Sequence, residues 1–267
     1  MKVNFLIIGA AKSATTSLSE ILSRHPDICF SHLKEPQFFS QPDWRNNLKK
    51  YHSNFKRKAK LYGEGSTNYT KRPLFNPNIC EDIYEYNADI KLIYIMRHPI
   101  DRIISQFIHL YNRGYETSKD LDALVKSNSN YIDTTRYFHQ IDPYISKFGR
   151  NNVLLLFFED FISYPQKTTD IVCNFLNIDK VKIDSKVINQ NKSFDRRVLH
   201  YKYDDPKTFW TKLKKLGLIA KNYFNKEFLD DKPIISIDTR SYILNELVDE
   251  IKAIEGLTGK NLDHWKI

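Results

Sequence analysis

Cysteine is scarce in this sequence, with three residues in a chain of 267. Cys29, Cys80 and Cys173 are odd in number and far apart, which argues against a disulfide framework and against a zinc site made of closely spaced ligand pairs. A chain without disulfides suits a reducing compartment. We therefore expect a cytoplasmic protein that needs no metal.

Long apolar runs are also absent. No segment approaches the roughly 18 consecutive apolar residues that a membrane-spanning helix requires. The apolar run at residues 5–8 follows Lys2 and superficially resembles a signal peptide, but it is too short for the hydrophobic core of one. We interpret this run as a buried strand, and we expect a soluble protein without a transmembrane segment.

Acidic residues are outnumbered by basic ones, with 32 Asp and Glu against 41 Lys and Arg and a formal net charge of +9. Such an excess indicates an anionic partner and leaves a nucleotide, an acidic glycan and nucleic acid open. The sequence contains no recognisable nucleic-acid-binding motif. We therefore interpret the lysine clusters at residues 56–60 and 212–221 as solvated faces and expect no nucleic-acid partner.

Apolar segments alternate with segments of helical periodicity along most of the chain. Strands that alternate with helices form a parallel sheet covered by helices on both faces. No internal repeat or low-complexity linker divides the sequence, so we predict a single α/β domain over residues 1–267. The predicted strands are the apolar runs at residues 3–8, 28–31, 91–96 and 153–158, and the predicted helices cover residues 18–22, 99–114, 135–148, 165–176 and 239–254.

A turn of small and hydroxyl-bearing residues follows the first predicted strand. It reads Gly9-Ala10-Ala11-Lys12-Ser13-Ala14-Thr15-Thr16-Ser17. Small residues let the backbone approach a phosphate, the start of the next helix directs unpaired N–H groups at it, and the lysine adds a full charge. The turn is not a Walker A loop, because an alanine precedes the lysine where that loop needs glycine. An ordinary capped strand-to-helix turn is the less favoured alternative.

A second candidate anion site follows the strand at residues 91–96. Arg97 ends this strand, and Ser105 lies about two turns into the next predicted helix. Ligands of open parallel sheets bind beyond the C-terminal ends of strands, where Lys12 also falls. An isolated arginine would be better explained by a surface ion pair, here with Asp101. Two such motifs after successive core strands favour a shared ligand.

Both motifs resemble those of the sulfotransferase family that uses 3′-phosphoadenosine 5′-phosphosulfate (PAPS). The segment Lys34-Glu35-Pro36-Gln37-Phe38-Phe39 is similar to one in the heparan-sulfate-type branch, which comprises N-deacetylase/N-sulfotransferases and 3-O-sulfotransferases. Gly65-Ser66-Thr67-Asn68-Tyr69 resembles another segment of that branch, without its proline. The resemblance covers residues 5–176 and points to a bacterial member. It implies a P-loop-like three-layer α/β/α sandwich with a central parallel sheet.

The resemblance also implies how PAPS would be bound before its release as adenosine 3′,5′-bisphosphate. Arg97 and Ser105 would bind the 3′-phosphate, and Lys12 the phosphate oxygen that leaves. A sulfuryl group carries less charge than a phosphoryl group, so side chains suffice and no metal is expected. The 5′-phosphate would lie on the turn made by Lys12, Ser13, Ala14, Thr15, Thr16 and Ser17.

Glu35 is the candidate general base, because the resemblance places the catalytic glutamate of the heparan-type branch at this position. It follows a strand that we expect to lie beside the phosphate turn, and a structural ion pair with Lys34 or another cation is the alternative. His109 lies one helical turn after Ser105 and is a second candidate for acid–base or acceptor contact. We expect a saccharide or another small hydroxyl or amine compound as acceptor. Residues 189–197 are the candidate for the family's C-terminal nucleotide loop.

Two other functions stay open from the sequence. A P-loop kinase-like phosphotransferase is one, because Glu159 and Asp160 end an apolar strand as a Walker B motif does, although the missing Gly-Lys pair argues against it. A non-enzymatic anion- or glycan-binding protein is the other, and it rests on the net charge. In that case Lys12 and Arg97 would not form a nucleotide site.

Overall fold

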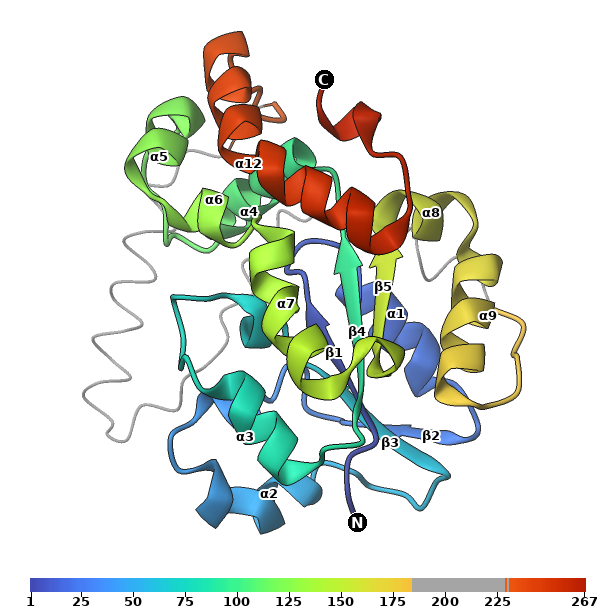
Figure 1. The fold of residues 1–267 in the computed structure, drawn as a ribbon. Coiled ribbons are helices and arrows are strands. Elements are labelled where there is room, and N and C mark those ends of the chain that lie inside the picture. Colours follow the sequence, from blue (N-terminus) through green and yellow to red (C-terminus); the bar gives the residue numbers. More distant parts are fainter. Residues whose placement is uncertain (184–228, 230) are drawn as a thin grey trace, which may run out of the picture.

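Five parallel strands form a single sheet in the computed structural model, which describes residues 1–183, 229 and 231–267 (Figure 1). The strand order is β2-β3-β1-β4-β5, so the sheet extends from β1 in both directions. All four neighbouring pairs are parallel. The strands are β1 (Phe5–Gly9), β2 (Ile28–Phe30), β3 (Leu61–Gly65), β4 (Lys91–Met96) and β5 (Val153–Phe157).

The sheet is buried on both faces, because side chains of a strand point alternately to opposite sides. In β1, Leu6 and Ile8 belong to one apolar core, whereas Phe5 and Ile7 belong to a second core on the other face. Helices cover both cores, and this three-layer α/β/α arrangement confirms the predicted fold class. The main helices of the first core are α3 (Ile79–Tyr86), α4 (Pro99–Asn112), α6 (Asn130–Asp133), α7 (Tyr137–Phe148) and α12 (Ile237–Thr258), and those of the second are α1 (Thr15–Ser23), α8 (Phe158–Ser163) and α9 (Pro165–Leu176).

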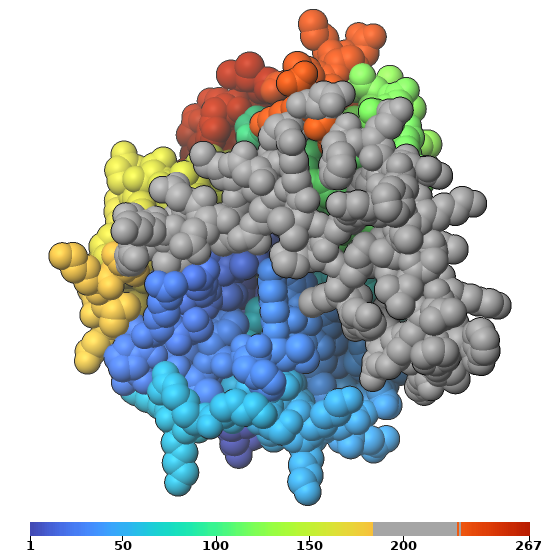
Figure 2. All heavy atoms as spheres, turned by 180° about the vertical axis from the view of Figure 1, so that it is seen from behind, coloured from blue at the N-terminus to red at the C-terminus, as the bar shows by residue number. Residues whose placement is uncertain are grey.

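The second core lies under the face seen from behind, where α1 is blue and α8 and α9 are yellow (Figure 2). The remaining helices, α2 (Leu48–His52) and α5 (Leu121–Ser127), also add side chains to the first core. The described 3₁₀ turns are η1 (Phe38–Ser40), η2 (Trp44–Asn47), η3 (Thr67–Thr70), η4 (Arg150–Asn152) and η5 (Asp263–Trp265). No helix within the described ranges is both long and apolar enough to span a membrane.

The four predicted strands are confirmed, and β3 is the strand that the periodicity did not reveal. Its sequence contains two glycines and a glutamate, which are poor strand formers. Gly63 is required by packing, since a Cβ atom there would lie 2.0 Å from the ring of Phe5 on the neighbouring strand. Because β3 separates β2 from β1, our expectation that β2 lies beside the phosphate turn was wrong.

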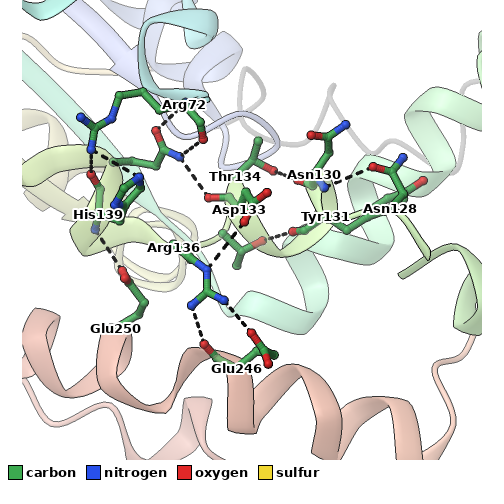
Figure 3. A network of polar contacts seen from close by, with 12 residues as sticks. Arg72, Asn128, Asn130, Tyr131, Asp133, Thr134, Arg136, His139, Glu246 and Glu250 are labelled. Carbon is green, nitrogen blue, oxygen red and sulfur yellow. Dashed lines mark hydrogen bonds and ion pairs between the residues drawn. The ribbon is translucent and has the colours of Figure 1, made fainter. Parts of the chain in front are cut away.

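The C-terminal helix α12 packs on α7 through apolar side chains and a polar network (Figure 3). Arg136 donates to the carboxylate of Glu246 at 2.6 Å and to its carbonyl oxygen at 2.7 Å. The backbone N–H of His139 donates to Glu250 at 3.0 Å, and the backbone carbonyl of His139 accepts from Arg72 at 2.6 Å. The network thereby joins α12 to the segment that follows β3.

Two sequence predictions fall on residues that the structure does not describe. They are the candidate nucleotide loop at residues 189–197 and the lysine cluster at residues 212–221. For the same reason the single-domain organisation over residues 1–267 stays a prediction.

Candidate active site

The turn between β1 and α1 has the backbone shape of an anion-binding concavity. Lys12 and Ala14 both have positive φ, at 73° and 65°, so left-handed residues alternate with others along the turn. Ala14 is the N-cap of α1, and the first N–H groups of a helix have no partner within it. The hydroxyl of Ser13 is completely buried and has no hydrogen-bond partner among the described residues. The turn therefore presents donors and a lysine toward one point.

Gly9 lets this turn approach the neighbouring strands closely. A Cβ atom at this position would lie 2.1 Å from the hydroxyl of Thr70 and 2.7 Å from the ring of Tyr94. That hydroxyl donates to the carbonyl of Ile8 at 2.7 Å, which ties the turn after β3 to the end of β1. Only glycine leaves room for this bond.

Arg97 lies directly beside the phosphate turn. Its Nη1 donates to the carbonyl of Lys12 at 3.3 Å, and its guanidinium stacks on the ring of Phe158 at 4.3 Å. Its Nε is buried and has no hydrogen-bond partner in the part of the chain that the structure describes. Asp101 pairs instead with Lys232 at 3.5 Å, so the alternative explanation of Arg97 as the partner of Asp101 is not observed there.

The backbone around Arg97 is fixed from two sides. The hydroxyl of Tyr137 donates to the Arg97 carbonyl at 2.7 Å, and the N–H of His98 donates to Glu159 at 2.7 Å. Helix α4 begins immediately afterwards, and His98 caps its N-terminus because the imidazole accepts from the N–H of Ile100. Arg97 therefore stands at a rigid junction between a central strand and a helix.

Ser105 and His109 lie one turn apart on α4, with Ser105 buried and His109 half-buried. Burial, together with the charges of four nearby cations, lowers the pKa of His109 from 6.5 to about 3. The imidazole is therefore neutral at physiological pH in the free protein. In order of influence, the cations are Lys12, Arg113, Lys71 and Lys34.

Glu35 reaches the same group of charges from the loop after β2. Its carboxylate accepts from the hydroxyl of Thr67 at 3.5 Å, across the end of β3. Its negative charge favours the protonated form of both Lys12 and Lys71. Although β2 is not adjacent to β1, the loop carries Glu35 over β3 and into the neighbourhood of Lys12.

The site has an excess of positive charge in the free protein. Burial and, to a smaller extent, the positive charges of Lys34 and Arg113 lower the pKa of Lys12 from 10.5 to about 8, and the negative charge of Glu35 opposes this shift. Burial likewise lowers the pKa of Lys71. A bound dianion would offset both effects, because an opposite charge favours the protonated lysine. The site is thus built to accept anionic groups.

Two cations and one carboxylate of this region were missed by the sequence analysis. Lys71 and Arg113 come to the site through tertiary packing, from the segment after η3 and from the end of α4. Glu64 lies fully buried in β3 behind the Glu35 loop. A signal for Glu64 did exist, because it directly precedes the segment 65–69 that resembled the sulfotransferases.

Glu159 Oε1 and Asp160, the acidic pair after β5, make structural contacts, whereas Glu159 Oε2 is buried without a partner among the described residues. Glu159 accepts from the backbone N–H of His98, and Asp160 forms an ion pair with Lys260. These contacts weigh against the kinase-like alternative, in which the pair would face a nucleotide-bound Mg²⁺. Within residues 1–183, 229 and 231–267, no group of three His, Cys, Asp or Glu side chains is arranged to hold a metal ion.

Fold and site together define a P-loop-like α/β protein with two adjoining candidate anion sites at the C-terminal ends of β1 and β4. Residues 2–254 match the family model described as the sulfotransferase domain. The chain belongs to the sulfotransferase family, which confirms the resemblance found in the sequence.

Several curated relatives carry heparan sulfate sulfotransferase names. Bifunctional heparan sulfate N-deacetylase/N-sulfotransferase 1 of Caenorhabditis briggsae is 22% identical over 222 residues, which covers 74% of this chain and 25% of the relative. Mouse heparan sulfate glucosamine 3-O-sulfotransferase 3B1 is 26% identical over 198 residues, covering 71% and 50%. The chain thus spans at most half the length of these two relatives.

Solved structures show the same fold. A sulfotransferase from Alicyclobacillus acidocaldarius matches with a TM-score of 0.71 and 23% identity, and 100% of each chain is covered. A mouse sulfotransferase solved in complex with PAP matches with a TM-score of 0.55 and 16% identity, covering 97% of this chain and 88% of that one.

Proposed function

We propose that this protein transfers a sulfuryl group from PAPS to a hydroxyl or amine of a saccharide. The observation that carries the proposal is the junction of the two anion sites, where Arg97 donates to the carbonyl of Lys12. Ser13 Oγ and Arg97 Nε are buried without a partner in the described part of the chain. Buried donors of this kind are costly unless a ligand satisfies them, and two phosphates of one nucleotide would do so.

The donor would be held at both of its ends. The backbone turn and the hydroxyls of Ser13, Thr15, Thr16 and Ser17 suit the 5′-phosphate, with Ala14 supplying its left-handed backbone. Arg97, stacked on Phe158, and Ser105 suit the 3′-phosphate. PAPS is a substrate in this scheme, and the product that remains bound is adenosine 3′,5′-bisphosphate.

Glu35 and Lys12 would act at opposite ends of the reacting bonds. The acceptor oxygen or nitrogen forms a bond to sulfur while the bond from sulfur to the 5′-phosphate oxygen breaks. Glu35 takes the acceptor proton, and protonated Lys12 stabilises the negative charge that develops on the departing phosphate oxygen. His109, neutral in the free protein, would accept a hydrogen bond from the acceptor or share its proton.

The saccharide acceptor is supported by charge and by the relatives. Lys34, Lys71 and Arg113 add positive charge next to Lys12 beyond the residues assigned to the donor phosphates. Heparan sulfate appears in the names of several relatives. The predicted cytoplasmic location and the single domain over residues 1–267 remain proposals.

The test is a transfer assay with ³⁵S-labelled PAPS and a panel of glycans and small alcohols or amines. Wild-type protein should label at least one acceptor, and Lys12→Ala and Glu35→Ala should reduce the rate at least 100-fold. Lys50→Ala, on the exposed side of α2, serves as the control and should keep the wild-type rate. Unchanged transfer in the first two variants would refute the site assignment.

Nucleotide selectivity separates this proposal from its rivals. Adenosine 3′,5′-bisphosphate should raise the melting temperature, because a ligand that binds only the native state stabilises it. Stabilisation by Mg-ATP alone would favour a kinase-like enzyme. Glycan binding with steep salt dependence and no nucleotide effect would favour a non-enzymatic anion-binding protein.

A further inference from the structure

A buried carboxylate lies behind the loop that carries Glu35. Glu64 in β3 has no exposed surface, and it accepts from Ser66 Oγ at 2.8 Å and from Tyr69 at 2.8 Å. Tyr51 contributes a longer contact of 3.5 Å. The assigned reaction uses none of these groups, so the cost of burying the carboxylate needs another explanation.

The hydroxyl of Ser66 connects the Glu64 carboxylate to the loop that carries Glu35. It accepts from the backbone N–H of Gln37 at 2.9 Å while it donates to Glu64. In its ionised form this carboxylate only accepts hydrogen bonds, so it then orients the single Ser66 proton toward itself and leaves the oxygen lone pairs for Gln37. The chain of contacts thus has one direction, from Gln37 through Ser66 to Glu64.

The loop that receives this support is strained. Glu35 and Gln37 have φ values of 48° and 50°, in the left-handed region that non-glycine residues rarely adopt. Such conformations persist only where surrounding contacts hold them. Ser66 holds the loop at Gln37, and its neighbour Thr67 contacts the Glu35 carboxylate at 3.5 Å.

The turn that supplies both contacts is itself fixed to the core. Thr70 Oγ1 donates to the carbonyl of Ile8 at 2.7 Å, and Tyr144 donates to the carbonyl of Tyr69. Its residues from Ser66 to Thr70 are all buried. A rigid turn therefore faces a strained loop, and hydrogen bonds at Glu35, at Gln37 and, just after the loop, from the N–H of Phe39 to Tyr69 at 3.4 Å join them.

We infer that Glu64 is a positioning residue that, through Ser66, holds the Glu35 loop in its strained conformation and so directs the general base at the acceptor. The inference rests on the proposed function for the role of Glu35, whereas the clamp between Glu64, Ser66 and Gln37 can be tested without it. Glu64 is too deeply buried to be the base itself.

The first measurement is amide hydrogen exchange at Gln37 in the whole protein. Ser66→Ala and Glu64→Gln should each increase the Gln37 exchange rate at least tenfold. Tyr51→Phe removes a donor from the same carboxylate but leaves Ser66 in place, so it is the matched control and should exchange like wild type. Wild-type protection in Ser66→Ala would overturn the clamp, and this variant decides the matter if Glu64→Gln does not fold.

The second measurement separates positioning from a general loss of structure. Ser66→Ala should lower kcat for sulfuryl transfer about 10- to 100-fold while KM for PAPS and the Kd of adenosine 3′,5′-bisphosphate stay within twofold of wild type. A matching loss of nucleotide affinity, or an unchanged kcat, would contradict the inference. If wild-type protein transfers no sulfuryl group, the proposed function is wrong. The exchange experiment still tests the clamp between Glu64, Ser66 and Gln37 in that case.

Discussion

Replacing Lys12 with methionine should stabilise the free protein while removing its response to nucleotide. Burial and neighbouring cations lower the pKa of Lys12 from 10.5 to about 8, so its charged form is disfavoured in the folded state. At about 1.4 kcal/mol per pKa unit the cost of this charge at neutral pH is at most about 3 kcal/mol. Because Lys12 keeps some contact with water, we expect about 1–2 kcal/mol.

The sign of this effect follows from linkage. Between pH 8 and 10.5 the folded protein has released the Lys12 proton while the unfolded chain still binds it, so this group makes stability rise with pH. Below pH 8 the full penalty is present. Lys12→Met removes the penalty and keeps most of the apolar stem, so its melting temperature at pH 7 should rise by about 2–6 °C.

The nucleotide response should change in the opposite direction. Adenosine 3′,5′-bisphosphate at about 100 times its Kd should stabilise wild type by about 2.7 kcal/mol, and the same concentration should have little effect on Lys12→Met. Differential scanning fluorimetry with and without ligand measures both quantities. Lys50→Met is the control and should leave both within about 0.5 kcal/mol of wild type. A Lys12→Met protein that melts lower than wild type, or responds fully to the nucleotide, would refute the reasoning.

Three further predictions concern other parts of the structure. Burial raises the pKa of Glu64 from 4.5 to about 7. The free energy of unfolding should therefore fall by up to about 3 kcal/mol as the pH rises from 4.5 to 7. Urea titrations at about pH 5 and 8 should show this fall in wild type and lack it in Glu64→Gln. Phe158→Leu removes the ring under Arg97 and should weaken adenosine 3′,5′-bisphosphate binding about two- to fivefold in calorimetry, with AMP affinity unchanged. A double-mutant cycle of Arg136→Ala and Glu246→Ala should give a coupling of about 0.5–1 kcal/mol, and zero coupling would show that their contact does not anchor α12.

The sequence predicted those elements whose signals are local. Continuous apolar runs marked β1 and β4, because strands buried on both faces need apolar side chains throughout. The strand β3 escaped because Gly63 and Gly65 are there for close packing against Phe5 and Ser19, a tertiary requirement that no periodicity records. With β3 missing, the order of the strands was also incomplete.

The candidate site shows the same division. The phosphate turn and Arg97 were predicted because each follows a recognisable strand at its C-terminal end. The positive φ of Glu35 and the contribution of Lys71 depend on contacts between segments far apart in the chain. The assignment of catalytic roles stays a prediction until variants are assayed.

The central claim is that one nucleotide occupies both anion sites. A crystal structure with adenosine 3′,5′-bisphosphate at saturating concentration tests it most directly. We predict the 5′-phosphate on the turn at residues 12–17 and the 3′-phosphate against Arg97 and Ser105. Nucleotide bound elsewhere, or a saturated crystal with both sites empty, would contradict the account.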